Sequence, residues 1–181
     1  MPEQLDQAKI VAAVCGATEE VFSTMLSIPV AAQEAYRQSS KPAPADGVMA
    51  LLGLAGKWVG TGSLCCSPQL AREISGKLLM SEFASVDQEV LDAVGEVTNM
   101  IVGNFKNSLE NEIGPTGLGI PVVIFGHNFT ASSIHTTDWV VVPFLCGAEK
   151  LEVKVCLAKQ MQPAHTRRAT DVHAPMSQVT L

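Results

Sequence analysis

The chain has few charged residues and few aromatic ones. Charged side chains make up 17% of its 181 residues, and aromatic side chains make up 5%. With 12 basic against 18 acidic residues, the formal net charge is -6 at pH 7. Nucleic-acid binding draws much of its affinity from basic side chains that neutralise phosphates, and the sequence contains no basic stripe. The composition therefore argues against a nucleic acid as partner.

The chain also lacks a long hydrophobic run. No uninterrupted apolar stretch reaches the roughly 18 residues that a membrane span requires, and the N-terminal residues carry Glu3 and Asp6. We therefore expect no membrane partner and no signal peptide. The five cysteines are few, odd in number and mostly set in apolar stretches, which is typical of reduced thiols. A cytoplasmic location is the expectation that follows.

Apolar residues, by contrast, are plentiful at 47% of the chain. A chain of this length can bury roughly two thirds of its unfolded surface, so it can form a substantial core. We expect one domain over residues 1–159. From residue 160 the apolar content falls while prolines and arginines appear, and we predict a flexible C-terminal tail over residues 160–181.

The periodicity of the apolar residues predicts the order of helices and strands. Helical spacing covers residues 3–26, 68–79 and 86–109. Strand-like runs cover residues 48–55, 57–66, 118–126, 132–134, 138–146 and 150–157, with a short extended piece over residues 28–36. We expect the strands after residue 117 to form an antiparallel meander. The fold class is then α+β, with helices packed on an antiparallel sheet.

The predicted helix over residues 86–109 is the most informative segment. At about 100° per residue, its valines, Ile101, Phe105 and Leu109 fall in one arc. The positions opposite this arc are Asp92, Glu96, Asn99 and Gly103. Any amphipathic surface helix has a polar side, so this polar stripe does not by itself identify a function. Gly95 and Gly103 add weight, because a glycine inside a helix costs about 1 kcal/mol and usually has a packing or functional reason, such as a closely approaching partner.

The segment from residue 91 to residue 106 resembles the signature helix of the CheC and CheX chemotaxis phosphatases. It has the pattern Asp92-x-x-x-Glu96-x-x-Asn99, continues through Gly103, and is followed by Pro121. The order of elements resembles that family more loosely over about residues 10–158. The first helix offers only Glu19-x-x-Phe22 and Glu20-x-x-Ser23, neither of which contains an amide. The chain is therefore similar to the single-site CheX branch rather than to the duplicated CheC branch.

The resemblance implies a role for each residue of the stripe. Asn99 would orient the water that attacks the aspartyl-phosphate of a CheY-like response regulator, and Glu96 would pair with the active-site lysine of that partner. Asp92 and Gly103 would be flanking, partner-binding positions. The chain itself would bind no cofactor, because the response regulator would hold the Mg²⁺. The resemblance also implies a homodimer formed through the sheets.

Two other interpretations of the stripe stay open. It could dock a response regulator without catalysis, or it could simply face water in a structural subunit. A metal site near His127, His135 and Asp138 is a further possibility, but the eight-residue separation of the histidines matches no standard ligand spacing. We therefore predict no metal site.

Overall fold

One antiparallel sheet organises the protein. The computed structural model describes residues 5–39, 45–130 and 138–160. Within these ranges the sheet has eight strands, with a central path β1-β7-β8-β4-β3-β5 to which β2 is added on β7 and β6 on β3. The strands are β1 (Ala31–Ala32), β2 (Tyr36–Gln38), β3 (Ala45–Gly56), β4 (Trp58–Cys66), β5 (Thr116–Leu118), β6 (Val122–Phe129), β7 (Trp139–Cys146) and β8 (Glu149–Lys159).

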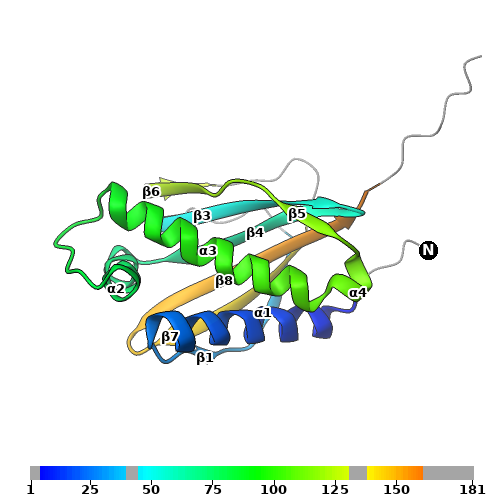
Figure 1. Ribbon diagram of the computed structural model, residues 1–181, viewed down its shortest axis with the longest axis horizontal. Helices are drawn as coiled ribbons and strands as arrows, with labels where there is room; N and C mark the ends of the chain where they lie inside the picture. Colours follow the sequence, from blue (N-terminus) through cyan, green and yellow to red (C-terminus); the bar gives the residue numbers. More distant parts are fainter. Residues whose placement is uncertain (1–4, 40–44, 131–137, 161–181) are drawn as a thin grey trace, which may run out of the picture.

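The helices cover one face of this sheet. They are α1 (Gln7–Val21), which continues into a π-helical turn η1 (Phe22–Leu26), α2 (Pro68–Leu79), α3 (Gln88–Ser108) and the short α4 (Glu110–Ile113). Figure 1 shows α3 crossing in front of the sheet, with α1 on one side of it and β5 and β6 on the other. Among the helices of the described ranges, none has the length and apolar character needed to cross a membrane.

Local sequence signals set where the helices begin. In each case a side-chain oxygen accepts a hydrogen bond from a backbone N–H of the first turn, which satisfies a group that would otherwise lack a partner. The capping pairs are Asp6 with Ala8 (3.0 Å), Ser67 with Leu70 (3.1 Å) and Asp87 with Val90 (3.0 Å). Helix α3 also has Glu89 in its first turn and Lys106 in its last, which suits the helix dipole.

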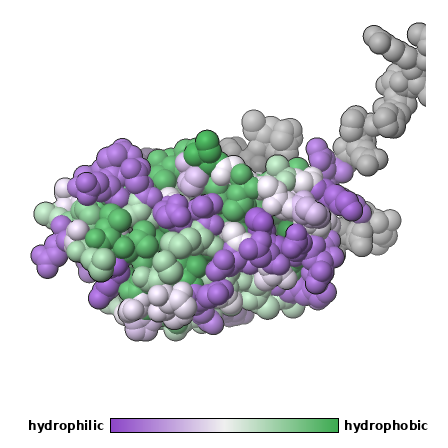
Figure 2. All heavy atoms as spheres, viewed as in Figure 1, coloured by the Kyte–Doolittle hydropathy of each residue, from purple (hydrophilic) through white to green (hydrophobic). Residues whose placement is uncertain are grey.

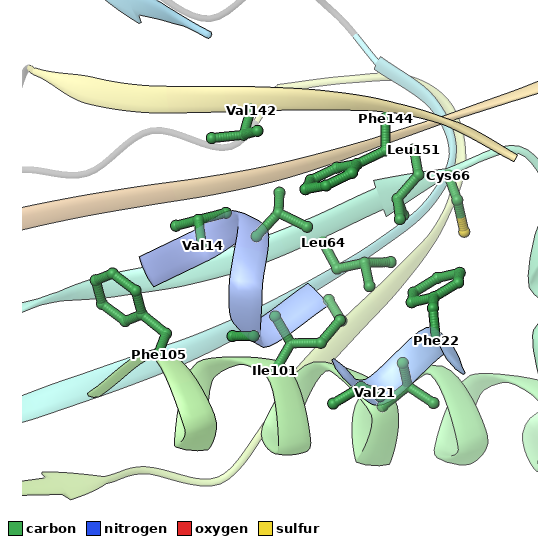
Figure 3. Packing of buried hydrophobic residues seen from close by; sticks show 14 of the residues in the cluster. Val14, Val21, Phe22, Leu64, Cys66, Ile101, Phe105, Val142, Phe144 and Leu151 are labelled. Atoms are coloured by element: carbon green, nitrogen blue, oxygen red, sulfur yellow. The ribbon is translucent and has the colours of Figure 1, made fainter. Parts of the chain in front are cut away.

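The core lies between the helices and the sheet. Apolar side chains from β4, β7 and β8 meet side chains from α1, η1 and α3, as Figure 3 shows. The residues at the centre are Val14, Phe22, Leu64, Ile101, Phe105, Val142, Phe144 and Leu151, each at most 1% exposed. Burying an aliphatic or aromatic side chain completely stabilises a protein by roughly 1.5–3 kcal/mol, so this layer holds α1 and α3 firmly on the sheet.

The fold class and most predicted elements are confirmed. The strand pair predicted over residues 48–55 and 57–66 is the hairpin β3–β4, in which Val48 pairs with Cys66. The predicted helix over residues 3–26 begins only at Gln7, and its last turn is π-helical. The strand predicted over residues 132–134 lies outside the described residues, as does the predicted tail apart from its first residue.

The predicted meander of the closing strands is wrong. Strands β7 and β8 form a hairpin, but β8 then pairs with β4, while β5 and β6 both pair with β3 on the opposite side of the sheet. The segment predicted as one strand over residues 118–126 is therefore two strands, joined by Gly119, Ile120 and Pro121. The β3–β4 hairpin has two open edges, and the closing strands fill both of them.

Candidate active site on helix α3

Helix α3 lies close against the middle of the sheet. A Cβ built on Gly62 of β4 would come within 2.5 Å of a methyl group of Val102, so α3 can approach β4 only because residue 62 has no side chain. Val102 also joins Leu52 and Leu54 in a second apolar cluster, which lies under the β5 side of α3. The helix is consequently covered on a wider arc than its valine pattern predicts.

The structure brings the predicted stripe residues to the open side of α3. Asp92 and Glu96 are exposed, whereas Asn99 and Gly103 are half-buried. Glu96 and Asn99 are three residues apart, so their side chains project from the same side of the helix about one turn apart. The residues on the other side of α3, including Val94, Val97 and Ile101, are at most 1% exposed.

The four stripe positions differ in their hydrogen bonds. Asp92 accepts a hydrogen bond from the side-chain amide of Gln88 at 2.7 Å, which is an intrahelical contact. Within the part of the chain that the structure describes, the side chains of Glu96 and Asn99 make no hydrogen bond or ion pair. A carboxylate and an amide with unused hydrogen-bonding capacity are therefore available to a partner.

The stripe is also acidic. The sequence from residue 92 to residue 103 contains two carboxylates and no lysine or arginine. Like charges four residues apart on a helix repel each other, by about the 0.2–0.5 kcal/mol that an opposite pair would gain. A partner that brings a cation to Glu96 would relieve this repulsion. The surface is therefore suited to a basic group placed beside Asn99.

The two glycines of α3 have different surroundings. A Cβ built on Gly95 would lie 3.2 Å from Val123 and 3.5 Å from Pro121, so this buried glycine lets the start of β6 pack against the helix. A Cβ on Gly103 would meet only Leu118, at an ordinary 3.8 Å. The structure thus gives Gly95 an intramolecular packing reason, whereas the partner-binding role of Gly103 stays a prediction.

Sequence reasoning missed two neighbours of the stripe. The Asn104 amide donates a hydrogen bond to the Glu20 carboxylate at 3.1 Å and so links α3 to α1. Ile120, in the β5–β6 connection, is 88% exposed. The register between β6 and β3 is a non-local property, so no local pattern around residue 120 could have placed it beside α3.

The other potentially reactive groups are the histidines and cysteines away from the stripe. No three His, Cys, Asp or Glu side chains in the described ranges are placed to hold a metal ion together. His127 lies 3.5 Å from Asp46 on the surface, and His135 is outside the described residues. No disulfide joins the cysteines of the described ranges, and burial raises the pKa of Cys65 and of Cys146 to about 11. At neutral pH these two thiols therefore stay protonated.

Comparisons with known proteins agree with this architecture. The model of the family described as Chemotaxis phosphatase CheX matches residues 48–145. A crystal structure of CheX from Desulfovibrio desulfuricans is 30% identical, covers 83% of this chain and 99% of its own, and has a TM-score of 0.73. A putative chemotaxis protein from Desulfovibrio vulgaris Hildenborough is 27% identical, with coverages of 83% and 97% and a TM-score of 0.75. No curated protein sequence matches the chain.

The fold and the exposed acid–amide helix define a protein of the CheC/CheX class. Because the family model spans more than half of it, the chain belongs to the CheX family of chemotaxis phosphatases. A complex of CheX with CheY, BeF3 and Mg²⁺ from Borrelia burgdorferi has the same fold, at 23% identity, coverages of 85% and 99% and a TM-score of 0.68.

Proposed function

We propose that this protein hydrolyses the aspartyl-phosphate of a CheY-like response regulator, using Asn99 and Glu96. The single observation that carries the proposal is that these two side chains lie next to each other on the open side of α3. Neither makes a hydrogen bond or an ion pair among the described residues. Membership of the CheX family and the existence of a CheX–CheY complex in Borrelia burgdorferi support this choice of substrate.

The two side chains have complementary tasks in this proposal. The carboxamide of Asn99 has both a donor and an acceptor, so it can hold a water molecule in line with the phosphorus atom. The Glu96 carboxylate pairs with the lysine of the receiver's active site and fixes the orientation of the docked pair. Phosphoryl transfer depends on positioning and charge stabilisation, so no covalent intermediate on this chain is required.

The positive charge beside the phosphoryl group comes from the partner in this proposal. We propose that the response regulator holds the Mg²⁺ beside its phosphoryl group and that this chain contributes no metal ligand. Asp92 and Gly103 flank the docking helix in this arrangement. We place the reaction in the cytoplasm, because cysteines that form no disulfide within the described ranges suit a reducing compartment.

The decisive experiment measures phosphate release from a phosphorylated CheY-like receiver with catalytic amounts of this protein. The wild type should accelerate release, and Asn99→Ala should lower the rate at least about a hundredfold while the receiver still binds. Glu96→Ala should weaken binding roughly tenfold, because it removes a charge pair. Asn107→Ala is the matched control, since Asn107 is an exposed amide two turns further along the same helix.

The outcomes separate catalysis from docking. Equal rates for the wild type and Asn99→Ala would refute the catalytic role of Asn99. Binding of the receiver by the wild type with no faster phosphate release would instead establish a non-catalytic response-regulator-binding module.

We also propose that the protein forms a homodimer through the sheet edge at β6. This strand pairs with β3 on one side only within the described residues, and it exposes Val122 (59%) and Phe125 (45%). An edge strand with exposed apolar side chains is a template for pairing with a second copy. Val122→Lys should shift the mass measured by light scattering from dimer to monomer, whereas Met25→Lys, a similarly exposed position on η1, should not. A monomeric wild type would refute the dimer.

A further inference from the structure

We propose that Ile120 is an apolar docking residue for the response regulator, placed beside the catalytic amide. The inference rests on the proposed function and adds to it a second contact of different chemistry. A single exposed apolar residue is common on protein surfaces and by itself means little. Ile120 differs from such a residue in its position, in the firm hold on its backbone and in its apolar neighbours.

The position of Ile120 follows from the contacts on either side of it. Pro121 packs against Gly95 of α3, and Leu118 lies beside Gly103. These two glycines are about 12 Å apart along the helix axis, and Asn99 lies midway between them. The segment that joins Leu118 to Pro121, which contains Ile120, therefore runs alongside the turn of α3 that carries Asn99.

The orientation of the stripe brings Asn99 towards this segment. At about 100° per residue, Asn99 is rotated by about 40° from Gly95, which faces Pro121, whereas Glu96 is rotated by about 100°. Asn99 consequently lies between the directions of Pro121 and Leu118, so the apolar ledge of Leu118, Ile120 and Pro121 borders the acidic stripe beside the amide. Figure 2 shows hydrophobic surface over the β5–β6 side, bordering the hydrophilic surface of α3.

The connection that carries Ile120 is held firmly. The Gly119 N–H donates a hydrogen bond to the carbonyl of Gly53 at 2.9 Å, and β5 and β6 on either side both pair with β3. Proline at the next position restricts the backbone further. A segment whose backbone is already held loses little backbone entropy when a partner binds it, so burial of its side chain contributes to affinity efficiently.

The size of the partner brings Ile120 within its reach. A receiver domain of about 120 residues has a radius of gyration of roughly 13 Å. A domain of that size which places its phosphoryl group over Asn99 must extend across the ledge beside it. Ile120, with 88% of its surface exposed, is the most protruding apolar side chain of this ledge. The chemistry that fits it is an apolar rim around the receiver's acidic pocket.

The test compares docking with turnover. For Ile120→Ala, the KM for the phosphorylated receiver should rise about tenfold, because an aliphatic contact is lost, while kcat changes by less than about twofold. Ile120→Leu should restore most of the affinity. Leu145→Ala, which removes an exposed aliphatic side chain from β7 near the other edge of the sheet, should leave both constants unchanged.

A binding measurement keeps this inference separate from the proposed function. The affinity for a receiver carrying beryllofluoride and Mg²⁺, a stable mimic of the phosphorylated state, is measured by titration and requires no hydrolysis. If the wild type binds the mimic but does not release phosphate, the catalytic proposal fails while the Ile120 contact is still tested. The inference is overturned if Ile120→Ala binds the mimic as tightly as the wild type, or if its only effect is to change the oligomeric state.

Discussion

Helices α1 and α3 lie side by side on the same face of the sheet, yet only α3 presents an acid and an amide together. In α3, Glu96 and Asn99 follow each other by three residues within one continuous helix of 21 residues. In α1, the residue three positions after Glu19 is Phe22, which is fully buried in the core. The same spacing thus produces a surface site in one helix and a core contact in the other.

The backbone of α1 adds a second difference. After Val21 the helix widens into the π-helical turn η1, in which the hydrogen bonds span five residues. Ser23, three residues after Glu20, donates its hydroxyl to the Glu20 carbonyl at 3.1 Å and so faces its own helix. An amide three residues after a glutamate therefore forms a surface site only where the helix stays regular and its side is open.

The largest effect on stability is expected at Phe22, which packs into the core at the end of α1. Phe22→Ala should lower the free energy of unfolding by roughly 3–5 kcal/mol, because it leaves a cavity in a fully buried layer. Urea denaturation followed by circular dichroism measures the loss. The neighbouring Ser23→Ala, at an exposed position, should change stability by no more than about 0.5 kcal/mol. A loss below about 1 kcal/mol for Phe22→Ala would mean that α1 is not anchored there.

Moving the amide from α3 to α1 should not move the activity. The double variant Asn99→Ala with Ser23→Asn is expected to stay at least about a hundredfold below the wild type in phosphate release, as Asn99→Ala does alone. The reason is that residue 23 lies in the π-helical turn. An amide there does not project from the same side of the helix as Glu20 in the way that Asn99 projects beside Glu96. Recovery of activity in the double variant would show that spacing alone suffices.

The close approach of α3 to the sheet predicts a smaller effect on stability. Gly62→Ala should cost about 1–3 kcal/mol, since its new methyl group would overlap Val102, a β-branched side chain with little freedom to move. Gly53→Ala on the adjacent strand is the control, because a Cβ there meets nothing within 4 Å. Chemical denaturation measures the free energy of unfolding of both variants. Equal values for the two would contradict the tight α3–β4 contact.

The smallest effect is expected for the hydrogen bond that joins the two helices. A double-mutant cycle with Glu20→Ala and Asn104→Ala should give a coupling energy of about 0.5–1 kcal/mol, because the contact lies on the surface. Unfolding of the four proteins in urea provides the values. Strictly additive single-variant losses would mean that α1 and α3 are held together by their apolar layer alone.

Much of this architecture could be predicted because its signals are local. Asp87 and Ser67 indicate where α3 and α2 begin, and the spacing of apolar residues from Val90 to Phe105 predicts the buried side of α3. The β3–β4 hairpin follows from two apolar runs around one tight turn. The CheX resemblance, carried by residues of a single helix, was available from the sequence for the same reason.

The pairing of the closing strands could not be predicted from local patterns. Strands β5 and β6 have apolar residues that fit any neighbouring strand. They pair with β3 because the free edge of β4 is already occupied by β8. The half-buried state of Asn99 and the packing of Gly95 against Pro121 follow from that choice. The catalytic roles of Glu96 and Asn99 stay predictions that phosphate-release measurements test.

Local sequence signals specify the helices, the central hairpin and the stripe that holds Glu96 and Asn99, since each arises from hydrogen bonds and side-chain spacing within a few turns of the chain. The surroundings of the stripe, in contrast, depend on how distant segments of the chain pack together. Strand pairing joins residues that are far apart along the chain, so the apolar ledge with Ile120 beside Asn99 exists only after the sheet has closed around α3.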